Sequence, residues 1–260
     1  MNRITALAAT ITMAAGSLAL TTPAQAAPTK ATAYKITAKA NVDTAIAKED
    51  TVKVRGRVTP KARGEKVVLQ QRVGTKKKWV KADKATIRRN GRYVLKDKPS
   101  TPGSREYRVL KPGSHGIKKG FSKPVAVEVY RWEKLAYRTP GPSANLAGAG
   151  VLIGTEYFGQ SLATQVSGTA STIEYTLGRK CTQLRATYAL TDSSASGASG
   201  AVNVTADGAP LAAHSLSVGT IVADQVLDIS DAFRLKFDVS TTATPAAVVA
   251  IATPEVLCTR

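Results

Sequence analysis

The sequence predicts an all-β protein, in which two β-sandwich domains follow a cleaved signal peptide. Apolar and polar residues alternate along many short segments, and turn-forming residues separate these segments. No segment shows the 3.6-residue periodicity of an amphipathic helix. The chain has 260 residues, more than one compact domain usually requires, so two domains are expected.

The first 26 residues have the features of a secretory signal peptide. Arg3 supplies the positive charge, residues 4–20 are rich in Ala, Leu and Thr, and Ala24-Gln25-Ala26 forms a small-x-small cleavage site. No later segment is apolar enough to span a bilayer. We therefore expect cleavage after Ala26 and a secreted mature chain without a membrane span, extracellular or associated with the cell wall.

The charge distribution supports a division of the mature chain. Residues 27–138 contain 30 Lys and Arg against 9 Asp and Glu, a formal charge of +21. Residues 139–260 contain 6 against 9, a charge of −3. A Pro-, Gly- and Ala-rich stretch follows the last basic strand, so we place a basic domain at residues 27–131 and a second domain at 132–260.

The basic domain consists of alternating segments. VKVRGRV (residues 52–58) places its valines on one face and its Lys and Arg on the other, and KVVLQQRV (66–73), GRYVLK (91–96) and REYRVL (105–110) have similar patterns. Over about residues 51–128 the pattern resembles the Ig-like and fibronectin-like modules of exported actinobacterial proteins. This resemblance implies a spacer or display module and names no ligand.

Two runs of cations occupy predicted turns of the basic domain. They contain Lys76, Lys77, Lys78 and Trp79 in the first run, and Arg88, Arg89 and Arg92 in the second. Three interpretations are open: a solvated basic face with a half-buried Trp79, a contact surface for anionic polymers, or a nucleic-acid surface. For an exported chain we expect an anionic wall polymer or an extracellular polysaccharide as partner, and no nucleic acid.

The two cysteines, Cys181 and Cys258, both lie in the second domain. An even count in an exported protein favours a disulfide. A metal pair is the alternative, but two lone thiols so far apart match no zinc spacing. We predict a disulfide that stabilises the domain by roughly 3–5 kcal/mol on the chain-entropy model.

About eight short strands in residues 132–260 predict a jelly-roll-like double sheet. The segments LIGTEYFGQSL, IEYTLGRKCTQLRATYALTDSSASGASGAVNVTADGAPL and VLDISDAFRLKFDV resemble the NPCBM family of carbohydrate-binding modules. The family pattern is matched at Gly154, Tyr157, Tyr175, Leu177, Gly178, Asp192, Asp207, Gly208, Asp228, Ser230, Leu235 and Val239. The resemblance implies a galactose-binding-like sandwich that attaches to glycans.

The chain also departs from this family pattern. TPAAVVAIATPEV (residues 244–256) lacks the acidic, His and Trp side chains that the family carries before its last strand. Cys181 stands where the family has a Tyr, which suggests a staple to the terminal strand. Asp192 and Asp207 are candidate ligand-binding residues, with turn chemistry and a structural calcium ion as the other interpretations.

No catalytic motif is present in the sequence. His115 and His214 lie in different predicted domains, and no nucleophile elbow, zinc-protease helix or phosphate loop occurs. We therefore predict a secreted, non-enzymatic protein, without a cofactor unless it holds structural calcium, that binds extracellular glycan or anionic cell-envelope polymer. The alternative is a structural protein whose sandwiches bind a protein partner.

Overall fold

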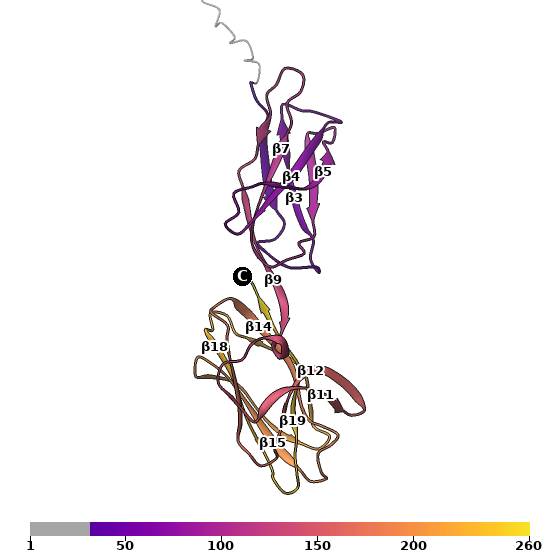
Figure 1. Ribbon diagram of the computed structural model, residues 1–260. Coiled ribbons are helices and arrows are strands. Elements are labelled where there is room, and N and C mark those ends of the chain that lie inside the picture. The colour runs from indigo at the N-terminus through magenta and orange to yellow at the C-terminus, as the bar shows by residue number, and fades with distance from the viewer. Residues whose placement is uncertain (1–31) are drawn as a thin grey trace, which may run out of the picture. The chain divides into compact units, whose positions relative to one another are not determined.

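The computed structural model describes residues 32–260 (Figure 1), so the predicted signal peptide lies outside the described residues. The fold is all-β, as predicted. The described residues form the following elements: β1 (Lys35–Ala40), β2 (Thr44–Ile46), β3 (Val52–Thr59), β4 (Lys66–Val73), β5 (Val80–Thr86), β6 (Arg92–Asp97), β7 (Gly103–Lys111), β8 (Gly120–Phe121), β9 (Val125–Lys134), the 3₁₀ helix η1 (Leu135–Tyr137), β10 (Ser143–Ala144), β11 (Leu146–Ile153), β12 (Glu156–Thr164), β13 (Ser171–Thr176), β14 (Cys181–Leu190), β15 (Ser199–Ala206), β16 (Ala209–Ser217), β17 (Ile221–Asp228), β18 (Arg234–Thr241) and β19 (Val249–Cys258).

Strands β1 to β9 form what we term the N-terminal sandwich. One sheet has the order β1-β3-β6, and the facing sheet contains β5, β4, β7 and β9. The alternation read from the sequence decides which side chains enter the space between the sheets, because successive residues of a strand point to opposite faces. The resulting core contains Val52, Val54, Val67, Leu69, Tyr93, Leu95, Tyr107, Val109, Val127 and Val129 among its buried members.

Strands β10 to β19 form what we term the C-terminal sandwich. Its first sheet has the order β10-β13-β18-β15-β16. The opposing strands β11, β12, β19, β14 and β17 are continuous, through β19 and β9, with the facing sheet of the N-terminal sandwich. Buried side chains of both sheets, such as Tyr175, Phe237, Leu184 and Val256, form a second core. Strand β19 pairs with both β12 and β14, so it lies inside its sheet.

Strand β9 takes part in the pairing of both sandwiches. Its residues 125–129 pair with β7, and its last residues, Arg131–Lys134, pair with residues 255–258 of β19. Figure 1 shows β9 running from the strands of the N-terminal sandwich to the end of β19. The boundary predicted at residue 131 therefore falls within a strand, and the two-domain division stays a prediction.

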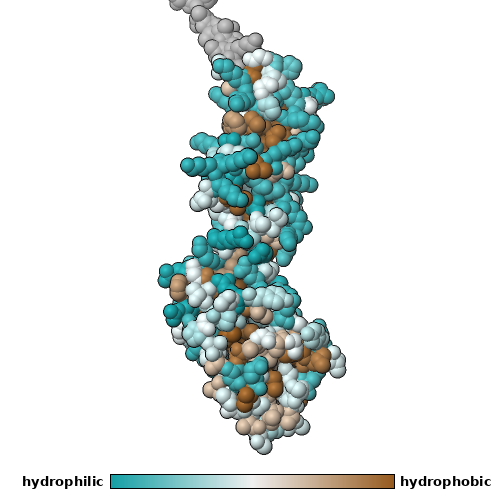
Figure 2. All heavy atoms as spheres, in the orientation of Figure 1, coloured by the Kyte–Doolittle hydropathy of each residue, from teal (hydrophilic) through white to brown (hydrophobic). Residues whose placement is uncertain are grey.

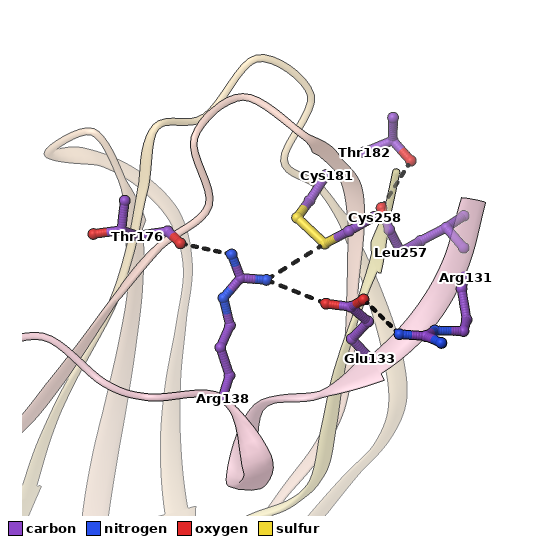
Figure 3. The surroundings of a disulfide bond; sticks show 8 residues. All are labelled: Arg131, Glu133, Arg138, Thr176, Cys181, Thr182, Leu257 and Cys258. Atoms are coloured by element: carbon purple, nitrogen blue, oxygen red, sulfur yellow. Dashed lines mark hydrogen bonds and ion pairs between the residues drawn. A yellow bond between two sulfur atoms is a disulfide. The ribbon is translucent and has the colours of Figure 1, made fainter. Parts of the chain in front are cut away.

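Cys181 and Cys258 form the predicted disulfide. The two residues are direct partners in the antiparallel register of β14 and β19, and both side chains are buried. Figure 3 shows the guanidinium of Arg138 beside this bond, where it donates to the carbonyl oxygen of Thr176 at 2.7 Å and lies 3.4 Å from the carboxylate of Glu133. The cross-link thus fastens the first residue of β14 to the last residue of β19.

Residues 32–260 contain no helix with the length and apolarity needed to cross a bilayer.

Candidate functional site

The outward face of the β1-β3-β6 sheet carries a dense group of cations. Alternate residues of the three strands point away from the core, and they include Lys35 and Lys39 of β1, Lys53, Arg55 and Arg57 of β3, and Arg92 and Lys96 of β6. A shallow hollow of about 810 Å³ lies along this sheet. We term it the cationic groove, defined by Lys35, Lys39, Arg55, Arg57, Arg88 and Arg92 among its lining residues.

The strand register brings like charges directly opposite one another on this sheet. Lys39 is paired with Arg55, Arg57 with Arg92, and Lys53 with Lys96. Directly opposed side chains lie close together, and each like-charge pair costs on the order of 0.5 kcal/mol. This arrangement of charges therefore lowers the stability of the folded sheet in the absence of a ligand.

Acidic side chains do not neutralise the cationic groove within the described part of the chain. None of its six cations has a carboxylate within ion-pair distance among residues 32–260. Residues 1–31 contain no Asp or Glu. In Figure 2 hydrophilic side chains cover most of the visible surface of the N-terminal sandwich. The groove thus offers a concentrated positive potential to anions.

Gly56 allows β1 to lie close to β3 at the centre of the groove. A Cβ atom at this position would be 1.7 Å from the carbonyl oxygen of Thr37 and 2.5 Å from the hydroxyl oxygen of Tyr93. Tyr93 crosses this space from β6 and donates its hydroxyl proton to the carbonyl oxygen of Thr37. Burial raises the pKa of Tyr93 further above its ordinary value, so the hydroxyl is protonated and available as a donor at neutral pH. Glycine is therefore required where the three strands of the groove meet.

Replacing Gly56 with Ala is expected to lower the free energy of unfolding by about 2 kcal/mol, because overpacking would push β1 away from β3. Urea unfolding of the two proteins measures this difference. Gly148→Ala is the matched control, because a Cβ there would meet only the carbonyl oxygen of Ala136, at 4.0 Å. Equal stability of the two alanine variants would contradict the packing argument.

The two predicted cation runs lie in connections between strands, except for Arg92, which is the first residue of β6, and they belong to different surfaces. Arg88 and Arg92 line the cationic groove, and Arg89 is exposed in the same turn between β5 and β6. Lys76, Lys77 and Lys78 are exposed in the connection between β4 and β5, which belong to the facing sheet. The structure thus divides the predicted patch and joins part of it to the cations of β1 and β3.

Trp79 lies under cationic side chains of the facing sheet. The guanidinium carbon of Arg108 is 4.2 Å from the centre of the Trp79 ring, and that of Arg72 is 4.8 Å away. Trp79 is half-buried and lies directly before β5. A nucleobase or sugar stacking on Trp79 would therefore have to compete with two guanidinium groups that lie over the ring.

Asp192 and Asp207 both hold turns of the C-terminal sandwich. The Asp192 carboxylate accepts the backbone N–H groups of Gly154 at 2.7 Å and Thr155 at 2.9 Å, and so fastens the β11–β12 hairpin. Asp207 accepts those of Phe233 at 3.0 Å and Arg234 at 2.8 Å. These bonds, that to Phe233 first, lower the pKa of Asp207.

The two carboxylates line separate hollows, so the structure does not bring them together. Asp207 adopts a left-handed conformation, with φ of 48°, before Gly208, as an Asp-Gly turn requires. Within residues 32–260 no three His, Cys, Asp or Glu side chains gather in a group that could hold a metal ion. The geometry of both residues thus fits turn chemistry.

In comparisons with known proteins, no protein-family model and no curated protein sequence matched this chain.

Proposed function

We propose that this chain acts outside the cytoplasm as a non-enzymatic binding protein, and that the cationic groove binds an anionic polymer of the cell envelope. The observation that carries the proposal is the like-charge register of β1, β3 and β6. Such a register costs folding free energy, and the attraction of these cations to a polyanion laid along the groove would offset that cost. The signal-peptide features of residues 1–26 and the disulfide support an extracytoplasmic location.

The chemistry of the groove favours recognition of charge over recognition of a base or sugar ring. Its lining contains six cations and one aromatic residue, Tyr93, which is buried in the core. Because no aromatic ring is presented to a ligand there by the lining residues, stacking contributes little. The expected partner is a flexible polymer with repeated phosphate or carboxylate groups, held by several simultaneous ion pairs.

The triple variant Arg55→Thr, Arg57→Thr and Arg92→Thr is expected to bind long-chain polyphosphate at least about tenfold more weakly than the wild type near 0.15 M salt. Binding releases the counterions of each neutralised phosphate. The slope of log affinity against log salt should therefore fall by up to about three for the three removed cations. Titration at several salt concentrations measures both quantities, with polyglutamate as the carboxylate ligand and dextran as the uncharged reference.

The triple variant Lys76→Thr, Lys77→Thr and Lys78→Thr is the matched control. It removes the same charge from the same sandwich, but at the β4–β5 connection. We expect this variant to retain most of the affinity. An equal loss in both triple variants would show that the polymer responds to net charge, and wild-type binding to neither polyanion would contradict the proposal.

A further inference from the structure

Arg108 occupies an unusual position on the sheet opposite the cationic groove. It lies on the outward face of β7, directly opposite Gln70 of β4. Its guanidinium carbon lies over two aromatic rings, 4.2 Å from the centre of Trp79 and 4.4 Å from that of Phe121. Trp79 precedes β5, whereas Phe121 belongs to β8, which pairs with the end of β7. Three segments that are distant in the sequence thus contact the side chain of Arg108.

The charge of Arg108 has no acidic partner within residues 32–260. The neighbouring Arg72, which also lies over Trp79, is paired with Glu106. Arg108 makes no ion pair there, and its Nε donates to the amide oxygen of Gln70 at 2.8 Å. Partial burial, and then the charge of Arg72, lower the pKa of Arg108. The protein therefore places this guanidinium where a nearby negative charge would stabilise it.

The contacts of Arg108 orient its free donors. With Nε bonded to Gln70, both terminal nitrogens remain without a hydrogen bond to any described residue. Contact with two aromatic rings restricts the rotation of the planar group. A fork of parallel N–H donors that is already ordered loses less conformational entropy when it binds a carboxylate or phosphate group.

From this arrangement we infer that Arg108, held by Trp79, Phe121 and Gln70, is a second anion-binding site that takes a single oxyanion in bidentate geometry. A phosphate, sulfate or carboxylate group of a polymer has the required chemistry. This site differs from the cationic groove, because it depends on one oriented fork and the groove depends on several distributed charges. It would exist even if the groove bound no polymer.

The experiment is an NMR titration of the mature chain with inorganic phosphate at constant ionic strength. The indole N–H signals of the tryptophans report binding. The chain has two tryptophans, and Trp132 is the internal control. The guanidinium of Arg185 lies 4.0 Å from the Trp132 ring centre, but its Nε and Nη2 atoms lie 2.7 and 2.5 Å from the carboxylate of Glu255. We expect a saturable shift of the Trp79 signal and no saturable shift of the Trp132 signal.

Arg108→Lys keeps the positive charge and removes the fork, so it should weaken phosphate binding at Trp79 by about tenfold. Arg88→Lys is the matched substitution in the cationic groove and should leave this titration unchanged, as should the triple groove variant. Separate titrations with acetate, sulfate and methyl phosphate identify whether carboxylate-, sulfate- or phosphate-bearing polymers fit the site. The inference is overturned if both indole signals respond alike, or if Arg108→Lys binds phosphate as tightly as the wild type.

Discussion

Replacing Cys181 and Cys258 together with Ala is expected to lower the free energy of unfolding of the C-terminal sandwich by about 4 kcal/mol. The disulfide joins residues that are 77 positions apart, so its loss releases a long loop in the unfolded chain. The substitution also removes the covalent link between the end of β19 and the start of β14, which are paired in the native sheet. Urea unfolding of the oxidised wild type and of the double variant measures the difference.

The reduced wild type separates the cross-link from the packing of its side chains. It retains both buried sulfur atoms without the covalent bond, so its stability should lie close to that of the double variant and somewhat above it. A difference below about 1 kcal/mol between oxidised and reduced wild type would contradict the expected role of the loop, because a loop of this length predicts several times more.

Lys111 is a buried cation that forms an ion pair with the carboxylate of Glu65. Its side chain is 2% exposed, and its Nζ atom lies 2.6 Å from the carboxylate of Glu65. The same nitrogen lies 4.2 Å from the ring centre of Tyr34 and donates to the hydroxyl of Ser114 at 3.1 Å. Ser114 in turn donates to Glu65 at 2.5 Å. These contacts fasten the loop after β7 to the residue before β4.

Glu65→Gln should lower the free energy of unfolding by about 3 kcal/mol, since it leaves the Lys111 charge buried without its partner. The double variant Glu65→Gln with Lys111→Met removes the buried charge as well and should therefore be more stable than Glu65→Gln alone. Chemical unfolding at neutral pH compares the three proteins. If the double variant were the least stable, the loss would arise from packing rather than from an unpaired charge.

The same ion pair predicts a pH dependence. The hydrogen bond from Lys111, and then that from Ser114, lower the pKa of Glu65 from its usual value of 4.5. The contribution of the Glu65 carboxylate to the free energy of unfolding is fully present above pH 4.5. It is lost as the pH falls through the lower pKa that Glu65 has in the folded state. The stability difference between wild type and Glu65→Gln should therefore narrow as the pH is lowered below 4.5. An unchanged difference at acidic pH would show that the carboxylate charge is not involved.

Local sequence patterns predicted the strands and their buried faces because each pattern depends on neighbouring residues. The alternation in residues 52–58 placed the valines inside and the cations outside, as observed. The disulfide could also be predicted, since the chain contains two cysteines. Both the buried faces and the disulfide could therefore be predicted without knowing the order of the strands in the sheets.

Arg88 and Arg92 of the cationic groove were among the predicted cations, but the rest of its composition could not be predicted, because it depends on strand order. Strand β3 lies between β1 and β6, although β4 and β5 separate β3 from β6 in the sequence. Lys39 therefore lies opposite Arg55, and Arg57 lies opposite Arg92, in a register that no local pattern reveals. Adjacent cations in the sequence predicted a contact surface at residues 76–78, whereas the groove consists mainly of cations on alternate residues of its strands. The contacts of Arg108 depend in the same way on pairing between distant strands.

The position of β19 has a consequence for the order of folding. It is the last strand along the described chain, yet it lies inside its sheet and also completes the pairing of β9. Partners so distant in sequence make the contact order high, which slows folding. Until residues 249–258 have been made, the end of β9 and the edges of β12 and β14 that pair with β19 have no partner strand. The C-terminal sandwich is therefore expected to complete its second sheet only after β19 has been made, and the disulfide between β14 and β19 can form only then.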